Sequence, residues 1–323
     1  MNIMIQAVVR SATLTLILAN LLFATTATYA ADPALHSLHF KPWINGDSAD
    51  EPQMQVQRYD DDTYVIRQSI RTNFEGPFLY LLFGRDRAFL IDTGAGGLKV
   101  RPTIDRVVAD WATRHHRAFI PLVVAHSHSH GDHHQGDAEF QDRPNTTVVG
   151  LYPKNVADFF KIADWPNQIV PYDLGGRLLD IIPTPGHQSA HVMIFDRNTR
   201  LLFSGDSLGP YRLYIWMNEV KTYRDSIDRV AAFTKEKHVS LILGAHIEMT
   251  TKPGELIPNE ASSHPDEHIL EISYSNLPEL QAALHAMGDN LVQQAHRDFV
   301  IFPLPAREQQ PFAPPVTPAP TSP

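Results

Sequence analysis

The stretch Val123–Gly136, which reads V-V-A-H-S-H-S-H-G-D-H-H-Q-G, holds five of the chain's seventeen histidines, one aspartate and no lysine or arginine. A solvated surface segment would carry Lys and Glu, and buried imidazole rings need polar partners. Neutral imidazole nitrogens and carboxylate oxygens are the ligands that zinc and similar divalent ions prefer. The cluster therefore predicts a metal site rather than a histidine-rich surface loop.

Four further polar residues each follow an apolar stretch elsewhere in the chain. They are Asp92 in I-D-T-G, His187 in T-P-G-H, Asp206 in S-G-D-S and His246 in G-A-H. Side chains carried on loops at strand ends can converge at one edge of a rigid scaffold. We therefore expect these four residues to lie near the histidine cluster.

The cluster contains the pattern H-x-H-x-D-H, written here as His128-Ser-His130-Gly-Asp132-His133. With this pattern the chain resembles the metallo-β-lactamase superfamily, and Asp92 in I-D-T-G matches a strand end of that family. The later members of the signature follow in the same order, and they are His187, Asp206 and His246. The matching segments span about Phe78 to His246, which is most of the chain.

The resemblance implies an α/β fold, the four-layer αβ/βα sandwich of the metallo-β-lactamase type, with a metal site between its sheets. It implies that one metal is held by His128, His130 and His187, that a second is held by Asp132, His133 and His246, and that Asp206 bridges them. The expected cofactors are two Zn2+, with Fe or Mn as alternatives. Two such ions, about 3.5–4 Å apart, would share a bridging hydroxide that attacks an ester, thioester or lactone carbonyl of a small-molecule substrate.

Other polar residues near these motifs are expected to support the site. We interpret Asp92 as a residue that orients a metal-bound histidine, since such histidines commonly donate to carboxylates. The same interpretation, or a place in the cleft, applies to His126, His134 and His191. Asp132 is also a catalytic candidate. Tyr211 is a second one, because its hydroxyl could face a developing oxyanion, with aromatic packing under its loop as the alternative.

Asp206 favours the ester, thioester or lactone hydrolase, because the dedicated β-lactamases of this family lack a bridging aspartate at that point. A β-lactamase is the alternative among hydrolases, supported by the export signal described below. A mononuclear iron dioxygenase acting on sulfur compounds is the alternative among oxidoreductases, since it uses a similar ligand set. The family's diiron reductases carry glutamate where His130 stands, and a net charge of −9 argues against nucleic acid as a partner.

The expected elements alternate between strands and helices along the chain. Strands are predicted at 64–70, 77–83, 88–92, 120–125, 147–150, 177–182, 191–195, 201–204 and 241–243, and helices at 98–114, 156–162, 223–235 and 277–298. The G-R-D-R stretch between the second and third strands predicts a β-hairpin. This order predicts two sheets packed face to face with helices outside.

The two ends of the chain differ from the rest. Residues 1–30 combine a single charge at Arg10, an apolar run from Ala12 to Ala24 and small residues before Ala31, which is typical of a signal peptide and short for a spanning helix. We therefore expect a periplasmic or secreted protein, with no stable membrane insertion after cleavage and a folded domain at 31–302. The proline-dense stretch 303–323 predicts a disordered tail. The chain has no cysteine, so disulfides and thiolate nucleophiles are excluded, and its oligomeric state stays open.

Overall fold

The computed structural model of the chain describes residue 37 and residues 39–314. Contacts between residues divide the chain into Met1–Asp32 and Pro33–Pro323, and everything described here belongs to the second unit. The predicted signal peptide, residues 1–30, lies outside the described residues. Within the described part of the chain, none of the helices has the length and apolar character needed to cross a membrane.

The first half of this unit forms a six-stranded sheet whose strands follow one another in chain order. Strands β1 to β4 are antiparallel to their neighbours, whereas β5 and β6 run parallel to β4. The strands are β1 (Met54–Asp60), β2 (Thr63–Gln68), β3 (Phe78–Phe83), β4 (Ala88–Ile91), β5 (Leu122–Ala125) and β6 (Thr146–Val148). The predicted hairpin is β3–β4, and helix α1 (Arg101–Arg114) connects β4 to β5.

The second half forms another six-stranded sheet, in the order β13-β12-β10-β9-β8-β7. Its strands pair antiparallel except for β10 and β12, which are parallel. They are β7 (Val170–Asp173), β8 (Leu178–Pro183), β9 (Val192–Asp196), β10 (Leu201–Gly205), β12 (Leu241–Gly244) and β13 (Glu271–Ile272). Three helices accompany this half, and they are α3 (Pro153–Phe160), α4 (Val220–Thr234) and α5 (Asn276–Met287).

The central strands of both sheets, such as β3, β4, β9 and β10, are buried on both faces, which explains why they read as nearly continuous apolar runs. In β3, Phe78, Tyr80 and Leu82 face the core between the two sheets, whereas Leu79, Leu81 and Phe83 face α1. Successive side chains of a strand point to opposite faces, so one strand serves two cores. The second sheet divides its residues in the same way, with Ile194 toward the first sheet and Phe195 toward α4 and α5.

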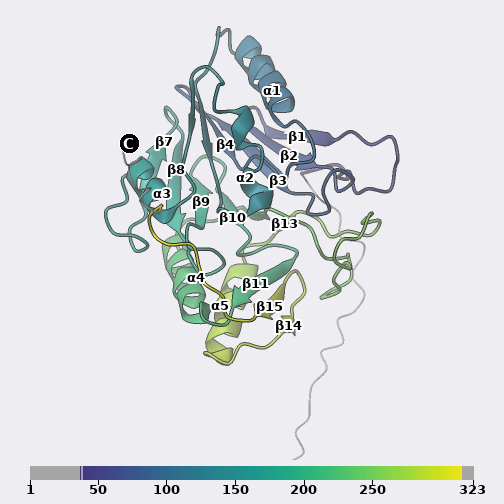
Figure 1. Cartoon of the computed structure of the whole chain (residues 1–323), viewed down its shortest axis with the longest axis vertical. Helices are drawn as coiled ribbons and strands as arrows, with labels where there is room; N and C mark the ends of the chain where they lie inside the picture. The colour runs from purple at the N-terminus through teal and green to yellow at the C-terminus, as the bar shows by residue number, and fades with distance from the viewer. Residues whose placement is uncertain (1–36, 38, 315–323) are drawn as a thin grey trace, which may run out of the picture. The chain divides into compact units, whose positions relative to one another are not determined.

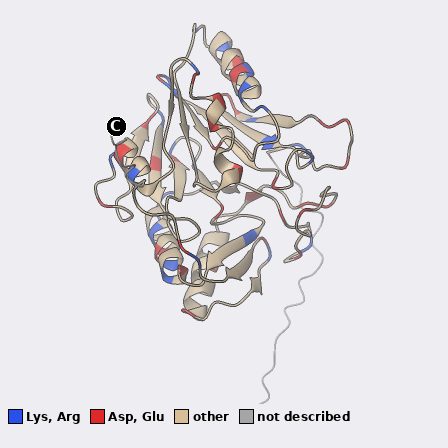
Figure 2. Cartoon of the chain, viewed as in Figure 1, with Lys and Arg blue, Asp and Glu red and all other residues tan. Residues whose placement is uncertain are grey.

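The layers are therefore helix, sheet, sheet and helix, with α1 on one side of the two sheets and α4 and α5 on the other (Figure 1). This confirms the predicted α/β class and the four-layer αβ/βα sandwich. Figure 2 shows the same division by chemistry, because the strands are mostly tan and the charged residues gather on helices and loops. Polar residues on a strand of either large sheet thus stand out as exceptions that need partners.

A third, three-stranded sheet has the order β11-β15-β14, with β11 (Arg212–Trp216) parallel to β15 (Val300–Leu304) and β14 (Gln294–Ala295) at its edge. The prediction of a disordered tail from Pro303 is corrected here, since Pro303 and Leu304 belong to β15 and pair with Ile215 and Trp216. The short strand β14 reaches only to the register of Ile301. Pro303 therefore lies beyond that pairing, where its missing N–H costs no ladder bond. Residues 315–323 lie outside the described residues.

The predicted helix at 277–298 is shorter in the structure. It ends at Met287, and Gly288 follows with φ +61°. A positive φ suits glycine and stops the helical backbone, so residues 294–295 are free to form β14. Other predicted elements are present with shifted ends, for example β6 at 146–148 and α3 at 153–160.

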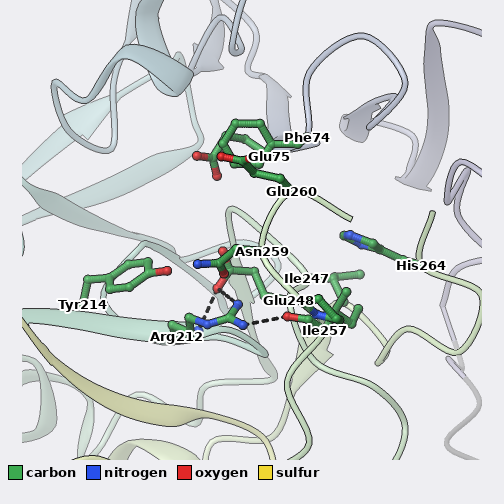
Figure 3. A pocket seen from close by; sticks show the side chains of 11 residues that line it. Phe74, Glu75, Arg212, Tyr214, Ile247, Glu248, Ile257, Asn259, Glu260 and His264 are labelled. Carbon is green, nitrogen blue, oxygen red and sulfur yellow. Dashed lines mark hydrogen bonds and ion pairs between the residues drawn. The ribbon is translucent and has the colours of Figure 1, made fainter. Parts of the chain in front are cut away.

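The long segment after β12 is fixed against the third sheet by Arg212 (Figure 3). The Arg212 guanidinium donates to the Glu248 carboxylate at 3.3 Å and to the Ile257 carbonyl at 2.6 Å, and its backbone N–H also donates to Glu248 at 3.0 Å. These bonds hold the segment beside β11 of the third sheet. The segment thereby forms one wall of the cavities described below.

Candidate metal centre and substrate cavity

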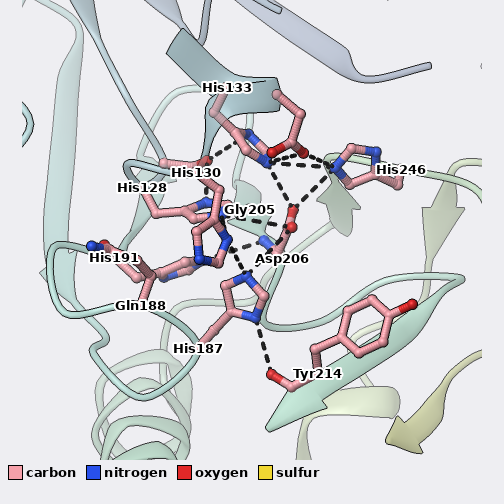
Figure 4. Close-up of polar contacts among 12 residues, drawn as sticks. His128, His130, His133, His187, Gln188, His191, Gly205, Asp206, Tyr214 and His246 are labelled. Carbon is pink, nitrogen blue, oxygen red and sulfur yellow. Dashed lines mark hydrogen bonds and ion pairs between the residues drawn. The ribbon is translucent and has the colours of Figure 1, made fainter. Parts of the chain in front are cut away.

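The structure brings the seven predicted ligands together at one edge of the sandwich (Figure 4). Four of them come from the first sheet, where His128 and His130 follow β5, and Asp132 and His133 lie in the short helix α2 (Gly131–His134). The other three follow strands of the second sheet, and they are His187 after β8, Asp206 after β10 and His246 after β12. The site is thus built from both sheets.

Three histidines form the first group. The Nδ1 atom of His130 lies 2.9 Å from His128 Nε2 and 3.0 Å from His187 Nε2. Three imidazole nitrogens facing one another at these distances are a donor set of the kind that a divalent ion accepts. This group could hold one metal ion.

A second group has two histidines and two carboxylates. The Asp132 Oδ2 atom lies 2.9 Å from His133 Nε2 and 3.2 Å from His246 Nε2. The two histidine nitrogens are 3.5 Å apart. This mixed nitrogen and oxygen set also fits a divalent ion, with Asp206 as its fourth member.

Asp206 stands between the two groups, with one oxygen toward each. Its Oδ2 lies 3.7 Å from His128 Nε2 and 3.6 Å from His187 Nε2. Its Oδ1 lies 3.4 Å from the Nε2 atoms of both His133 and His246. The Oδ1 atom is buried and has no hydrogen-bond partner in the described part of the chain. A buried carboxylate oxygen without a donor is costly unless a cation neutralises it, so the site fits metal.

Bonds outside the centre fix the orientation of three histidine rings. The Nδ1 atoms contact Asp92 Oδ2 at 2.9 Å for His133, the Tyr214 carbonyl at 3.0 Å for His187 and the Glu75 carbonyl at 2.9 Å for His246. A ring that donates through Nδ1 keeps its lone pair on Nε2, and Nε2 is the atom that points into the centre. These contacts therefore prepare the rings to bind metal.

Asp92 lies beside the site rather than in either ligand group, which fits the orienting role expected of it. Its carboxylate accepts the Ser127 backbone N–H at 2.7 Å, the Ser127 hydroxyl at 2.9 Å and His133. Asp92 has φ +67°, a left-handed conformation that aspartate tolerates better than most residues. The strand end is thus bent so that one buried carboxylate holds both the turn before His128 and the ring of His133.

The histidines outside the signature contact neighbouring residues and belong to neither ligand group. His191 Nδ1 contacts Thr184 Oγ1 at 2.7 Å, and its Nε2 accepts the Asp206 backbone N–H at 3.3 Å. Gly205 leaves room for this ring, because a Cβ there would lie 2.6 Å from His191 Nε2. His126 contacts Asp137 at 2.8 Å, and the His134 ring packs edge-on against His126.

The two groups differ in their electrostatics. Burial lowers the pKa of His130 to about 3, with the neighbouring His187 adding to the shift, and burial likewise holds the pKa of His128 well below its ordinary value. Burial also opposes the charged form of His246, but Asp206 and Asp132 outweigh it and raise the pKa of His246 to about 10. The first group is therefore neutral, whereas charge pairing dominates the second.

A cavity of about 160 Å³ opens onto the centre. It is lined by ligands and by residues of the third sheet and nearby loops, among them Glu75, Tyr214, Trp216, Glu248 and Leu304. A second cavity of about 240 Å³ continues from it, and the two share Glu75, Arg212, Tyr214 and Glu248 (Figure 3). Burial raises the pKa of Glu75 to about 7. Together the cavities provide room for a small molecule beside the centre.

The catalytic role predicted for Tyr211 does not fit this geometry. The Tyr211 hydroxyl donates its single proton to the Gly205 carbonyl, and the side chain is buried, with its ring edge-on to His246. Burial raises the pKa of Tyr211 well above its ordinary value, so the phenol stays neutral. The packing alternative describes this residue better, because no hydroxyl proton is left for an oxyanion.

Several residues of the site escaped the sequence-based analysis. Trp216 ends the apolar strand β11, and Glu75 lies in a loop without a motif. Arg307, which contacts His130 at 2.8 Å, and Gln310, which accepts the Ser129 hydroxyl at 2.9 Å, lie in the proline-rich stretch that predicted disorder. The signal available for this stretch was the continuous apolar run before Arg307, V-I-F-P-L, which forms β15.

A family model described as the metallo-beta-lactamase superfamily matches residues 73–240. That range contains every predicted ligand except His246, which follows it closely. Among known proteins, a hydroxyacylglutathione hydrolase from Rhizobium meliloti is 30% identical over an alignment of 152 positions that covers 44% of this chain and 57% of the relative. An acyl-coenzyme A thioesterase, MBLAC2, from Bos taurus is 25% identical over an alignment of 201 positions that covers 52% of this chain and 72% of the relative.

The chain thus spans less than two thirds of the length of the hydroxyacylglutathione hydrolase that it matches. Among solved structures, TMB-1 is 12% identical with a TM-score of 0.50, over 73% of this chain and 99% of that one. A metallo-beta-lactamase from Pontibacter korlensis is 17% identical with a TM-score of 0.48, over 72% and 99%. At these identities the similarity to solved structures concerns the fold alone.

Proposed function

Because this chain belongs to the metallo-β-lactamase superfamily, we propose that it is a metal-dependent hydrolase with two zinc ions that cleaves an ester, thioester or lactone. The observation that carries the proposal is the position of Asp206. Its two oxygens face different ligand groups, and the Oδ1 atom lacks any hydrogen-bond donor in the described part of the chain. A carboxylate shared by two ligand groups is suited to a pair of ions.

Bound as such a pair, divalent ions supply a nucleophile from water at neutral pH and polarise the carbonyl group that it attacks. The chain's own residues then have three tasks. Asp92, Glu75 and Tyr214 hold histidine rings in place through Nδ1. His191 holds the backbone of Asp206, and the cavity beside the centre positions the substrate carbonyl.

The substrate class follows from the site and from the relatives. Asp206 is the feature that distinguishes an ester, thioester or lactone hydrolase of this family from a dedicated β-lactamase. One relative is named a thioesterase and the other a hydroxyacylglutathione hydrolase, so a thioester is the first substrate to examine. A β-lactamase is the second candidate, and the chain's signal-like first thirty residues favour it, since an exported enzyme meets antibiotics first.

The decisive experiment is a substrate panel on the zinc-loaded protein, with a thioester, a lactone, a carboxylic ester and a chromogenic cephalosporin. We expect turnover of at least one of the first three and a much lower kcat/KM on the cephalosporin. The variant Asp132→Ala should lose turnover and metal. Exposed His116 contributes to neither ligand group, so His116→Ala serves as the control and should lose neither. Turnover of the cephalosporin alone would replace the proposal by the β-lactamase alternative.

Metal content separates hydrolysis from oxidation. We expect two zinc ions per chain after expression with zinc, measured by elemental analysis of the purified protein. A single iron per chain, together with oxygen consumption on a persulfide substrate, would instead support the dioxygenase alternative. Manganese or iron in two equivalents with hydrolytic activity would keep the reaction and change the metal.

We also propose that the protein is exported to the periplasm or secreted. The support is the composition of residues 1–30. Expression of the full chain in a Gram-negative host, followed by cell fractionation and N-terminal sequencing, tests this proposal. We expect a periplasmic form that begins near Ala31, and a cytoplasmic protein that keeps Met1 would contradict it.

A further inference from the structure

The chain after β15 crosses the rim of the metal centre, in a segment that we call the strap and define as residues 305–312. Its backbone is anchored at two places, since Asn218 exchanges bonds with the Arg307 backbone at 2.9 and 3.1 Å, and the Phe312 carbonyl accepts the Lys154 N–H at 2.8 Å. Between them, the Gln310 side chain accepts the Ser129 hydroxyl at 2.9 Å and a Gln188 N–H at 2.8 Å. Ser129 and Gln188 adjoin metal-ligand histidines in the sequence, so the strap is fixed directly over the site.

The Arg307 side chain is held in one orientation by this arrangement. Its guanidinium lies 3.8 Å from the centroid of the Trp216 ring, which is stacking distance. The Trp216 indole is itself fixed, because its Nε1–H donates to the His187 carbonyl at 3.0 Å. Trp216 lines the cavity at the centre, and the strap residue Arg307 is exposed. A preformed, accessible cation therefore stands at the rim of the cavity.

The contact between Arg307 and His130 lacks a hydrogen-bond acceptor when His130 binds a metal ion through Nδ1. An Arg307 Nη atom lies 2.8 Å from His130 Nε2, while His130 Nδ1 faces the other two histidines of its group. A neutral ring that offers the Nδ1 lone pair to a metal carries its proton on Nε2. Arginine has only N–H donors. Two donors then face each other without an acceptor between them.

At 2.8 Å the two nitrogens leave no room for an atom between them, so an anionic oxygen accepts from both only when the exposed Arg307 side chain moves away from His130. The Arg307 guanidinium forms no ion pair with any carboxylate of residues 37 and 39–314, so its charge is available. The cavity is also lined by the carboxyl groups of Glu75 and Glu248, and the Arg212 guanidinium in the same lining pairs with Glu248 at 3.3 Å. Of these two arginines, Arg212 is paired with a carboxylate and Arg307 is paired with none in the described part of the chain, so Arg307 is the one available to an anionic group.

We propose that Arg307, with the Nε2–H of His130, recognises a carboxylate or phosphate group of the substrate and so determines specificity for anionic acyl compounds. This inference rests on the proposed hydrolytic function, because it assigns the charge of that function's substrate. Arg307 is a specificity residue at the rim. It binds a remote group of the substrate while the reacting carbonyl lies at the metal centre.

The test compares paired substrates on the zinc-loaded full-length protein. The pair is the 4-nitrophenyl half-ester of succinic or glutaric acid and the corresponding neutral carboxamide ester. Arg307→Ala should raise KM for the anionic ester about tenfold to hundredfold, which is the range expected for loss of a hydrogen bond to a charged group. The kcat and KM of the neutral ester should stay within about threefold of the wild-type values. Arg307→Lys keeps the charge without the planar guanidinium, so its KM for the anionic ester should lie between those of the wild type and Arg307→Ala.

Two control variants separate recognition from loosening of the strap. Gln310→Ala removes the bonds to Ser129 and Gln188 but keeps Arg307, so any effect should be equal for both esters. Arg106→Ala removes an exposed arginine of α1 and should change neither KM. If Arg307→Ala changes KM of the anionic and neutral esters by the same factor, or of neither, the specificity role is wrong.

Calorimetric titration gives a second measurement that does not depend on turnover. We expect succinate or inorganic phosphate to bind the zinc-loaded wild type about tenfold or more tightly than Arg307→Ala, and the better of the two identifies the anion. Equal affinities for wild type and variant would overturn the proposal. If wild type hydrolyses neither ester, the ester part of the proposed function is wrong, and the titration still decides whether Arg307 binds anions.

Discussion

At the scale of single residues, both ligand groups of the centre depend on Asp206. Asp206 meets the Nε2 atoms of two histidines with each of its oxygens, at 3.4 to 3.7 Å. Gly205 before it has φ +52° and no side chain, which leaves the His191 ring in place to hold the Asp206 backbone. A carboxylate that serves two groups at once should therefore be the least replaceable residue of the site.

We predict that Asp206→Asn lowers zinc content below two per chain and reduces kcat/KM at least about 100-fold. The amide keeps the size of the side chain but replaces one ligand oxygen by an N–H donor, and loss of an outer partner alone already costs metal proteins about 10–100-fold. Elemental analysis and hydrolysis rates measure both effects. His116→Ala is the control, and an Asp206→Asn protein with two zinc ions and full activity would refute the bridging role.

Tyr211→Phe tests the corrected role of the tyrosine. The hydroxyl bonds to the buried Gly205 carbonyl, so its removal should cost about 1–3 kcal/mol of unfolding free energy and change kcat less than about tenfold. Loss of a donor to an oxyanion would instead cost about 100- to 1,000-fold in kcat. Urea unfolding and steady-state kinetics on the same preparation distinguish the two results.

The ligands could be predicted from the sequence because each lies in a short motif with fixed spacing. His128 and His130 share one side of an extended segment, and His187, Asp206 and His246 each follow a strand. The surrounding residues could not be found in this way. Trp216 and Arg307 meet across β11 and the strap, a contact that depends on the pairing of strands distant in the sequence.

At the scale of elements, strand ends place the chemistry and the strands themselves supply rigidity. The apolar runs of β3 and β9 divide their side chains between two cores, so these strands cannot shift by one residue without exposing a core face. This periodicity explains why the large sheets could be predicted. The end of α5 was predicted wrongly, since the Leu, Ala and Gln residues beyond Gly288 favour a helix that the positive φ of this glycine stops.

The start of α5 depends on a half-buried carboxylate whose effect should vary with pH. Asp298 accepts the Asn276 side-chain N–H at 3.0 Å and contacts His268 Nε2 at 3.3 Å. Burial opposes its ionisation, but these partners outweigh burial and lower the pKa of Asp298. A carboxyl whose pKa is lower in the folded than in the unfolded state stabilises the fold above its unfolded pKa of about 4, and this contribution disappears as the pH falls through the folded value.

Asp298→Asn should therefore be less stable than the wild type by about 1–3 kcal/mol at pH 7, and the difference should shrink as the pH is lowered toward 3. Urea unfolding of both proteins in chelator, at several pH values, measures the difference without metal binding. A difference that stays constant over this range would mean that the charge of Asp298 contributes nothing and that only shape matters.

At the scale of the whole described unit, the metal centre joins the two sheets. The loops after β5 carry ligands from the first sheet, and the loops after β8, β10 and β12 carry ligands from the second. The core between the sheets is apolar, whereas the centre at its edge gathers buried imidazoles and carboxylates whose charges need neutralising. Metal should thus contribute to stability as well as to catalysis, because the unfolded chain does not assemble the ligands.

We predict that zinc raises the melting temperature by about 5 °C or more relative to the protein in chelator. Zinc at 100 times the Kd of one site adds about 2.7 kcal/mol, and each kcal/mol raises Tm by about 2–4 °C in a domain of this size. Scanning calorimetry at increasing zinc concentration measures the shift. His116→Ala should shift like the wild type, whereas Asp206→Asn, with ligands on both sheets left unbridged, should shift much less. A wild-type Tm unaffected by zinc would mean that the two sheets do not need the metal to hold this edge together, and the bridging centre would have to be abandoned.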